Sequence, residues 1–122
     1  MEVLVVGNTA YVDDDFCAKA FPGDHLQVVA AHFGGWNIWP QSLAHPQPES
    51  VLYDTSSTLG MTDRDIVLRL IDKIGPDRLI FGTDFPMWSH EEELERFLAL
   101  GFTEAENRRI LSDNFKEFMG IE

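Results

Sequence analysis

The stretch GPDRLIFGTDFP, residues 75–86, holds a helix stop, a short buried strand and a polar strand end. Gly75 and Pro76 are typical of the end of a helix. The run Leu79–Phe81 is apolar throughout, as in strands that are buried on both faces of a parallel sheet. Asp84 follows closely, and parallel α/β folds gather their chemistry at the carboxyl ends of strands. We therefore expect a parallel strand with a functional aspartate at its end.

Apolar runs of the same character lie upstream, and two of them also end in polar side chains. His32 follows one of these runs and Asp54 follows the next. Because the carboxyl ends of parallel strands share one edge of a sheet, we expect His32, Asp54 and Asp84 on one rim. The expected strands are residues 26–31, 51–54 and 79–82, and a fourth run opens the chain at residues 3–6.

Helical patterns lie between and after the later strands. An apolar stripe runs from Ile66 to Ile74, and a final short helix is expected around Phe115 and Phe118. A weaker helical pattern at residues 36–43 is interrupted by Pro40. Alternation of strand and helix predicts an α/β fold with right-handed crossovers. Three residue pairs have capping-box spacing, namely Thr62/Asp65, Ser89/Glu92 and Thr103/Glu106.

Length and composition restrict the function classes. With 122 residues, the chain is long enough for a single domain, residues 1–122, and 44% hydrophobic residues argue against disorder. The formal net charge of -12 argues against a nucleic-acid or membrane-surface partner. The single cysteine, Cys17, excludes an internal disulfide. No apolar run is long enough to span a bilayer and no signal-peptide pattern opens the chain, so we expect a cytoplasmic location.

His32 and Asp84 are the two candidate catalytic residues. The glycines after His32 let the backbone turn sharply, which suits a base or a metal ligand at a strand end. The alternative for His32 is a ring bonded to a neighbouring backbone carbonyl. Asp84 follows a buried strand, where a carboxylate needs a cation or a cluster of donors. The alternatives for Asp84 are a cap for the next helix or a pair with Arg78.

The loops after the strands offer further candidates. The hydroxyl-rich segment DTSST, residues 54–58, could line the same site by hydrogen bonding, or it could cap the next element and satisfy loop backbone. Trp36, Trp39 and Trp88 could wall a substrate pocket or pack against the rim. Among aromatic side chains, Trp36 and Phe85 are the predicted substrate contacts.

Four motifs together resemble the C-terminal part of the amidohydrolase-related family. This family includes aminocarboxymuconate-semialdehyde decarboxylase and other metal-dependent decarboxylases and hydrolases. The resemblance covers about residues 20–119 and implies strands 6–8 of a partial (β/α)8 TIM barrel with one divalent metal, usually zinc. The motifs are AHFGGW at 31–36, YDTSS at 53–57, GPDRLIFGTDFP at 75–86 and RILSDN at 109–114.

The resemblance also implies roles for individual residues. His32 acts on the metal-bound water as a base or polarises the substrate, and Asp84 binds the metal and can shuttle a proton. Residues 110–114 dock the last helix. The family's His-x-His pair is absent from this sequence, and GNT at residues 7–9 stands where a further histidine ligand is expected. Three of the four usual metal ligands are therefore missing, and the chain is about half as long as a barrel of about 250 residues.

These features predict a metal-dependent hydrolase of this family that is truncated and inactive alone, with zinc bound only if the missing ligands are supplied. Two alternatives remain, a non-oxidative metal-dependent decarboxylase and a non-catalytic half-barrel or interaction module. The expected partners are a small-molecule substrate and either a second copy of the chain or a separate N-terminal half. Open strand edges and exposed apolar faces favour such self-association.

Overall fold

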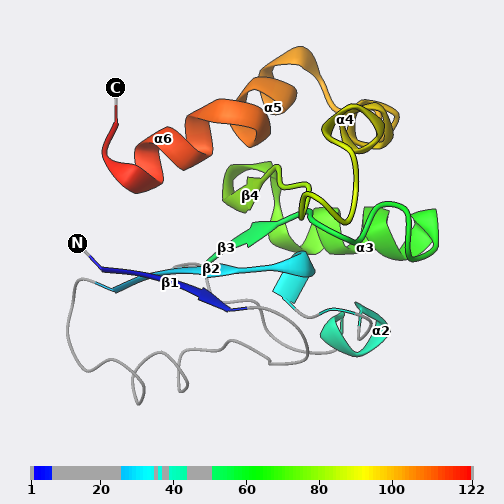
Figure 1. The fold of residues 1–122 in the computed structure, drawn as a ribbon, viewed down its shortest axis with the longest axis horizontal. Coiled ribbons are helices and arrows are strands. Elements are labelled where there is room, and N and C mark those ends of the chain that lie inside the picture. Colours follow the sequence, from blue (N-terminus) through cyan, green and yellow to red (C-terminus); the bar gives the residue numbers. More distant parts are fainter. Residues whose placement is uncertain (1, 7–25, 35, 37–38, 44–50, 122) are drawn as a thin grey trace.

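Four parallel strands form one sheet in the computed structural model, which describes residues 2–6, 26–34, 36, 39–43 and 51–121 (Figure 1). The strands are β1 (Glu2–Val6), β2 (Leu26–Ala30), β3 (Val51–Asp54) and β4 (Leu79–Ile80). They lie in the order β1-β2-β3-β4, with Ala30 beside Tyr53 and Asp54 beside Ile80. The predicted parallel strands are confirmed. Cys17 and the GNT segment lie outside the described residues.

Helices and short helical turns follow the strands. Figure 1 shows α4, α5 and α6 above the sheet and α2 near the end toward which β2 points. The alternation of strands and helices confirms the predicted α/β class. The elements are η1 (His32–Gly34), α2 (Trp39–Ser42), α3 (Arg64–Ile74), η2 (Pro76–Arg78), α4 (His90–Leu98), α5 (Glu104–Arg108), the π-helical turn η3 (Arg109–Asp113) and α6 (Asn114–Met119).

Helix α3 is amphipathic and begins later than the capping pattern predicts. Its buried stripe consists of Val67, Leu70 and Ile74, and it ends at a glycine with φ 87°. Asp63 occupies the N-cap position but makes no side-chain cap bond. The predicted Thr62/Asp65 capping box is therefore wrong, because the helix starts one residue too late for Thr62 to cap it.

The other predicted helix starts are confirmed to different degrees. Ser89 Oγ accepts a hydrogen bond from the Glu92 backbone N–H at 3.1 Å, which is one half of a capping box. Thr103 and Glu106 form both halves, at 3.1 and 2.9 Å. Pro40 sits in the first turn of α2, where its missing N–H has no helical partner to lose.

The core lies between the sheet and the helices that cover it. It is apolar and includes side chains from β2, β3 and β4 and from the helices α2, α3 and α4. Its buried members are Val28, Ala30, Phe33, Trp39, Val51, Tyr53, Leu70, Ile74, Leu79, Phe97 and Ile110. Among the residues that the structure describes, no helix is both long enough and apolar enough to cross a membrane.

Asn114 ties the last helix to β4. Its side-chain Nδ2 donates to the carbonyls of Pro76 and Leu79, each at 2.7 Å, and the side chain is buried. Nearby, the hydrogen bond to Glu117 and the charges of Glu117 and Asp77 raise the pKa of Arg109 above its ordinary value. These contacts agree with the predicted docking role of residues 110–114, and they fix the strand that leads to Asp84.

Candidate functional site

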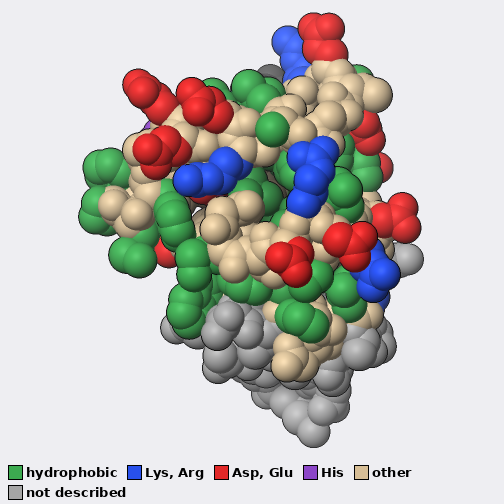
Figure 2. Space-filling view, turned by 90° about the vertical axis from the view of Figure 1, so that its right-hand side faces the viewer, with side chains coloured by type: hydrophobic (Ala, Val, Ile, Leu, Met, Phe, Trp, Pro, Cys, Tyr) green, Lys and Arg blue, Asp and Glu red, His purple; other side chains and the backbone are tan. Residues whose placement is uncertain are grey.

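A cavity of about 390 Å³ opens where the strands end. It brings together His32 after β2, Ser57 after β3 and Asp84 after β4, so two of the three residues predicted to share one rim line it. Asp54, the third, lies outside the lining, and its Oδ1 accepts from the His32 backbone N–H at 2.9 Å. Figure 2 looks at the molecule from the side toward which β2 points, and it shows hydrophobic side chains at the surface close to acidic ones. The cavity is lined by His32, Trp36, Ser57, Met61, Asp84, Met87 and Trp88.

Of the two predicted aromatic contacts, only one lines the cavity. Trp36 lines the cavity and is 38% exposed, so it is placed to contact a bound molecule. Phe85 lies outside the lining, where it is 66% exposed and packs against the ring of His90 at a centroid distance of 4.8 Å. Met61 and Met87 extend the apolar rim instead, and no pattern in the sequence pointed to them.

The backbone at His32 is held in an uncommon conformation. His32 has φ 56°, in the left-handed region, which costs an L-residue about 1–2 kcal/mol. Its N–H donates to Asp54 Oδ1 at 2.9 Å, and its carbonyl accepts from Trp39 Nε1 at 3.0 Å. These two bonds, one from the next strand and one from α2, stabilise the sharp turn.

The His32 ring is oriented through Nδ1. This nitrogen lies 3.0 Å from the Ser56 carbonyl oxygen and 2.9 Å from Ser56 Oγ. A carbonyl oxygen only accepts, so Nδ1 carries the hydrogen in that bond. The structure therefore shows the alternative arrangement for His32, in which the ring bonds to a backbone carbonyl. It also suits a base, because a neutral ring that donates through Nδ1 keeps its lone pair on Nε2.

Asp84 is oriented by the loop that follows β3. Its Oδ2 accepts a hydrogen bond from Ser57 Oγ at 2.7 Å, and that hydroxyl accepts in turn from Trp88 Nε1 at 2.9 Å. Ser57 is buried and has φ 50°, a left-handed conformation. Helix α4 is capped by Ser89 and not by Asp84, so the helix-cap alternative is not formed.

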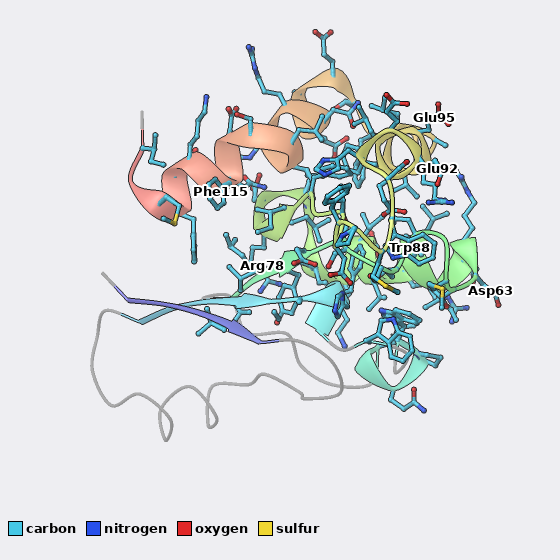
Figure 3. All side chains as sticks on the ribbon, viewed as in Figure 1. Asp63, Arg78, Trp88, Glu92, Glu95 and Phe115 are labelled. Carbon is cyan, nitrogen blue, oxygen red and sulfur yellow. The ribbon has the colours of Figure 1, made fainter. Side chains whose placement is uncertain are left out.

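Trp88 forms one wall of the cavity, and a side chain from α4 holds its ring in place. The guanidinium of Arg96 lies over the indole ring, 5.4 Å from its centroid, and the same group pairs with Glu93 at 2.7 Å. Glu93 is 1% exposed, so the ion pair is sheltered from water on the carboxylate side. In Figure 3, Trp88 lies below α4 on the side of the strand ends.

The described residues do not complete a metal site. Only His32 and Asp84 in the cavity are side chains that commonly bind zinc. Across the described ranges, no group of three His, Cys, Asp or Glu side chains is placed to hold a metal ion. A catalytic zinc usually takes about three protein ligands, so this part of a site is insufficient by itself.

The family model described as amidohydrolase matches residues 12–120. No curated protein sequence matches this chain. The fold is similar to that of an amidohydrolase from Burkholderia multivorans with bound zinc, with a TM-score of 0.70, 17% identity, and coverage of 88% of this chain and 48% of that one. It is also similar to a proposed 2-pyrone-4,6-dicarboxylic acid hydrolase from Pseudomonas putida, with a TM-score of 0.64, 21% identity, and coverage of 98% and 51%.

A dihydroxybenzoic acid decarboxylase from Polaromonas sp. JS666, with bound manganese and an inhibitor, is a third similar structure. Its TM-score is 0.63 at 18% identity, over 84% of this chain and 36% of that one. The chain thus spans between 36% and 51% of the length of these three proteins. At these identities the likeness shows the fold, and the partial coverage is consistent with part of a barrel.

Proposed function

Because the chain belongs to the amidohydrolase family, we propose that it is the C-terminal part of a metal-dependent hydrolase in which His32 and Asp84 carry the chemistry. The observation that carries the proposal is their common cavity. His32 and Asp84 follow different strands and are held by different loop residues, yet both line the same opening at the strand ends. Such convergence of a base and a carboxylate is what hydrolysis of a carbonyl compound requires.

The proposed roles follow from the hydrogen bonds. His32 donates through Nδ1, so its Nε2 is the nitrogen that accepts a proton from an attacking water. Asp84 has Oδ2 engaged by Ser57, which holds the carboxylate in place for returning a proton to the leaving group. Trp36 and Trp88 supply apolar walls for contact with the substrate.

In the complete site a divalent metal would polarise the substrate carbonyl and lower the pKa of a bound water. Asp84 is the proposed ligand from this chain, and the remaining ligands have to come from outside the described residues. The chain alone is therefore proposed to be inactive, as one part of a site that further strands complete.

A non-oxidative decarboxylase is the second candidate. The structure from Polaromonas sp. JS666 is that of a dihydroxybenzoic acid decarboxylase, and its fold matches the same part of the barrel. The same base and carboxylate serve either reaction, and the choice depends on substrate contacts. A non-catalytic half-barrel is the third candidate. Its one support is that the described residues bring only two side chains that commonly bind zinc, His32 and Asp84, to the cavity.

A chimera tests the proposal. The N-terminal part of the Burkholderia multivorans amidohydrolase, joined ahead of this chain, would restore the missing strands. The assays are zinc content and turnover of 2-pyrone-4,6-dicarboxylate and of a dihydroxybenzoate, which separate hydrolysis from loss of carbon dioxide.

In that chimera, His32→Ala should remove most turnover and leave the metal bound, whereas Asp84→Ala should reduce both. His90→Ala is the matched control, because His90 is exposed and lies outside the cavity lining. Full turnover in the His32→Ala chimera would refute the assignment of the base. An active chimera that holds no metal would refute the metal dependence.

A further inference from the structure

Asp54 accepts three hydrogen bonds through a single carboxylate oxygen. Oδ1 receives the His32 backbone N–H at 2.9 Å, the Ser56 backbone N–H at 3.0 Å and the Ser56 hydroxyl at 2.5 Å. The register explains the position, because Tyr53 pairs with Ala30 and Asp54 therefore stands beside the residue that precedes His32. One oxygen thus holds both the backbone of His32 and the serine that touches its ring.

The carboxylate sets the direction of the Ser56 hydroxyl. An ionised carboxylate only accepts hydrogen bonds, so Ser56 Oγ must be the donor to Asp54. A hydroxyl has a single hydrogen, and once this is given to Asp54 the oxygen can only accept from other groups. At 2.9 Å from His32 Nδ1, Ser56 Oγ therefore presents a lone pair to the ring.

Both neighbours of His32 Nδ1 are then acceptors. The Ser56 carbonyl at 3.0 Å accepts by its nature, and the Ser56 hydroxyl accepts because Asp54 takes its hydrogen. Without the carboxylate, the hydroxyl would be free to rotate and donate to a deprotonated Nδ1. We infer that Asp54, acting through Ser56, is a positioning residue that keeps His32 in the Nδ1–H tautomer and leaves the Nε2 lone pair for the cavity.

This inference rests on the proposed role of His32, but it is tested without turnover, substrate or metal. The measurement is imidazole ¹⁵N NMR of the isolated chain at about pH 9, where a free imidazole is neutral. The chain has four histidines, so the His32 signals are identified as those that His32→Ala removes. In the unmodified chain we expect Nδ1 to be protonated and Nε2 to be the bare nitrogen. A predominant Nε2–H form would overturn the inference.

Variants separate positioning from general stabilisation. Asp54→Ala frees the serine hydroxyl, and the Nε2–H fraction should rise by several fold. Asp54→Asn retains an acceptor oxygen in place of Oδ1, so it should restore the Nδ1–H form. If Asp54→Ala does not fold, Ser56→Ala replaces it and should shift the ratio in the same direction, because Nδ1 loses one acceptor. The shift should be smaller, because no hydroxyl is then left to donate to Nδ1.

A tautomer ratio that stays unchanged in every folded variant would overturn the inference and would not affect the turnover expected of the chimera. Conversely, a chimera that turns over without His32, together with the expected tautomer shifts, would refute the proposed function and leave this positioning role intact.

Discussion

Replacing Asn114 with alanine should lower the free energy of unfolding by roughly 1–3 kcal/mol. Two buried acceptors lose their donor, at about 1–3 kcal/mol each, while the removal of Asn114 Oδ1, which is buried without a partner among the described residues, offsets part of that loss. The side chain donates to two carbonyls, of Pro76 and Leu79, each at 2.7 Å. Asn114 is 3% exposed, so water cannot readily replace the lost donor. The effect is large beside a total stability of about 5–15 kcal/mol for a domain.

Urea unfolding followed by circular dichroism measures this change. With a slope of about 2 kcal/mol per molar urea, the midpoint should fall by roughly 0.5–1.5 M and the slope should stay the same. Asn107→Ala is the matched control, because Asn107 and Asn114 each have a buried Oδ1 without a hydrogen-bond partner among the described residues, whereas Asn114 also donates through Nδ2 to two carbonyls. Alanine is also the better helix former, so the control should be neutral or stabilising. Equal midpoints for the two variants would refute the docking role of Asn114.

Two further predictions concern the helix starts and the sheet edge. Thr103→Ala removes a complete capping box and should cost about 0.5–2 kcal/mol by the same urea assay, and no change would mean that the α5 cap contributes nothing. The isolated chain should self-associate, because β4 ends the described sheet and Leu111 and Phe115 near it are 40% and 47% exposed. Figure 3 shows Phe115 on α6, toward the edge of the sheet that β4 forms. Light scattering at about 100 μM that shows only a 13.9 kDa species would contradict this expectation.

The sheet could be predicted from the sequence because its strands are short apolar runs with polar ends. The final strand is nevertheless shorter than expected and ends at Ile80. The next backbone N–H, of Phe81, donates to the carbonyl of Ile110 at 3.0 Å, and that of Gly82 donates to Thr55 Oγ1 at 3.3 Å. Hydrogen bonds to the helical turn η3 and to a side chain thus replace the strand-to-strand hydrogen bonds of the sheet. Neither kind of contact produces a periodic pattern in the sequence.

The candidate site was predictable at His32 and Asp84, which follow strands, but the residues that orient them were not. The hydroxyls after β3 could equally have capped a helix or satisfied a loop. Ser57 adopts φ 50° between Asp84 and Trp88, both far away along the chain, and such a contact exists only after folding. The predicted Thr62/Asp65 capping box does not form, because α3 begins at Arg64 and Asp63 occupies the N-cap position.

The metal content of the purified chain tests the central claim most directly. The claim is that this chain holds only part of a metal-dependent site, with Asp84 as its ligand and His32 as its base. After dialysis, elemental analysis of the isolated chain should find no tightly bound stoichiometric zinc, because the described residues bring no third ligand to the cavity. One zinc per chain, lost in Asp84→Ala, would contradict the account and would show that the chain assembles a complete ligand set of its own.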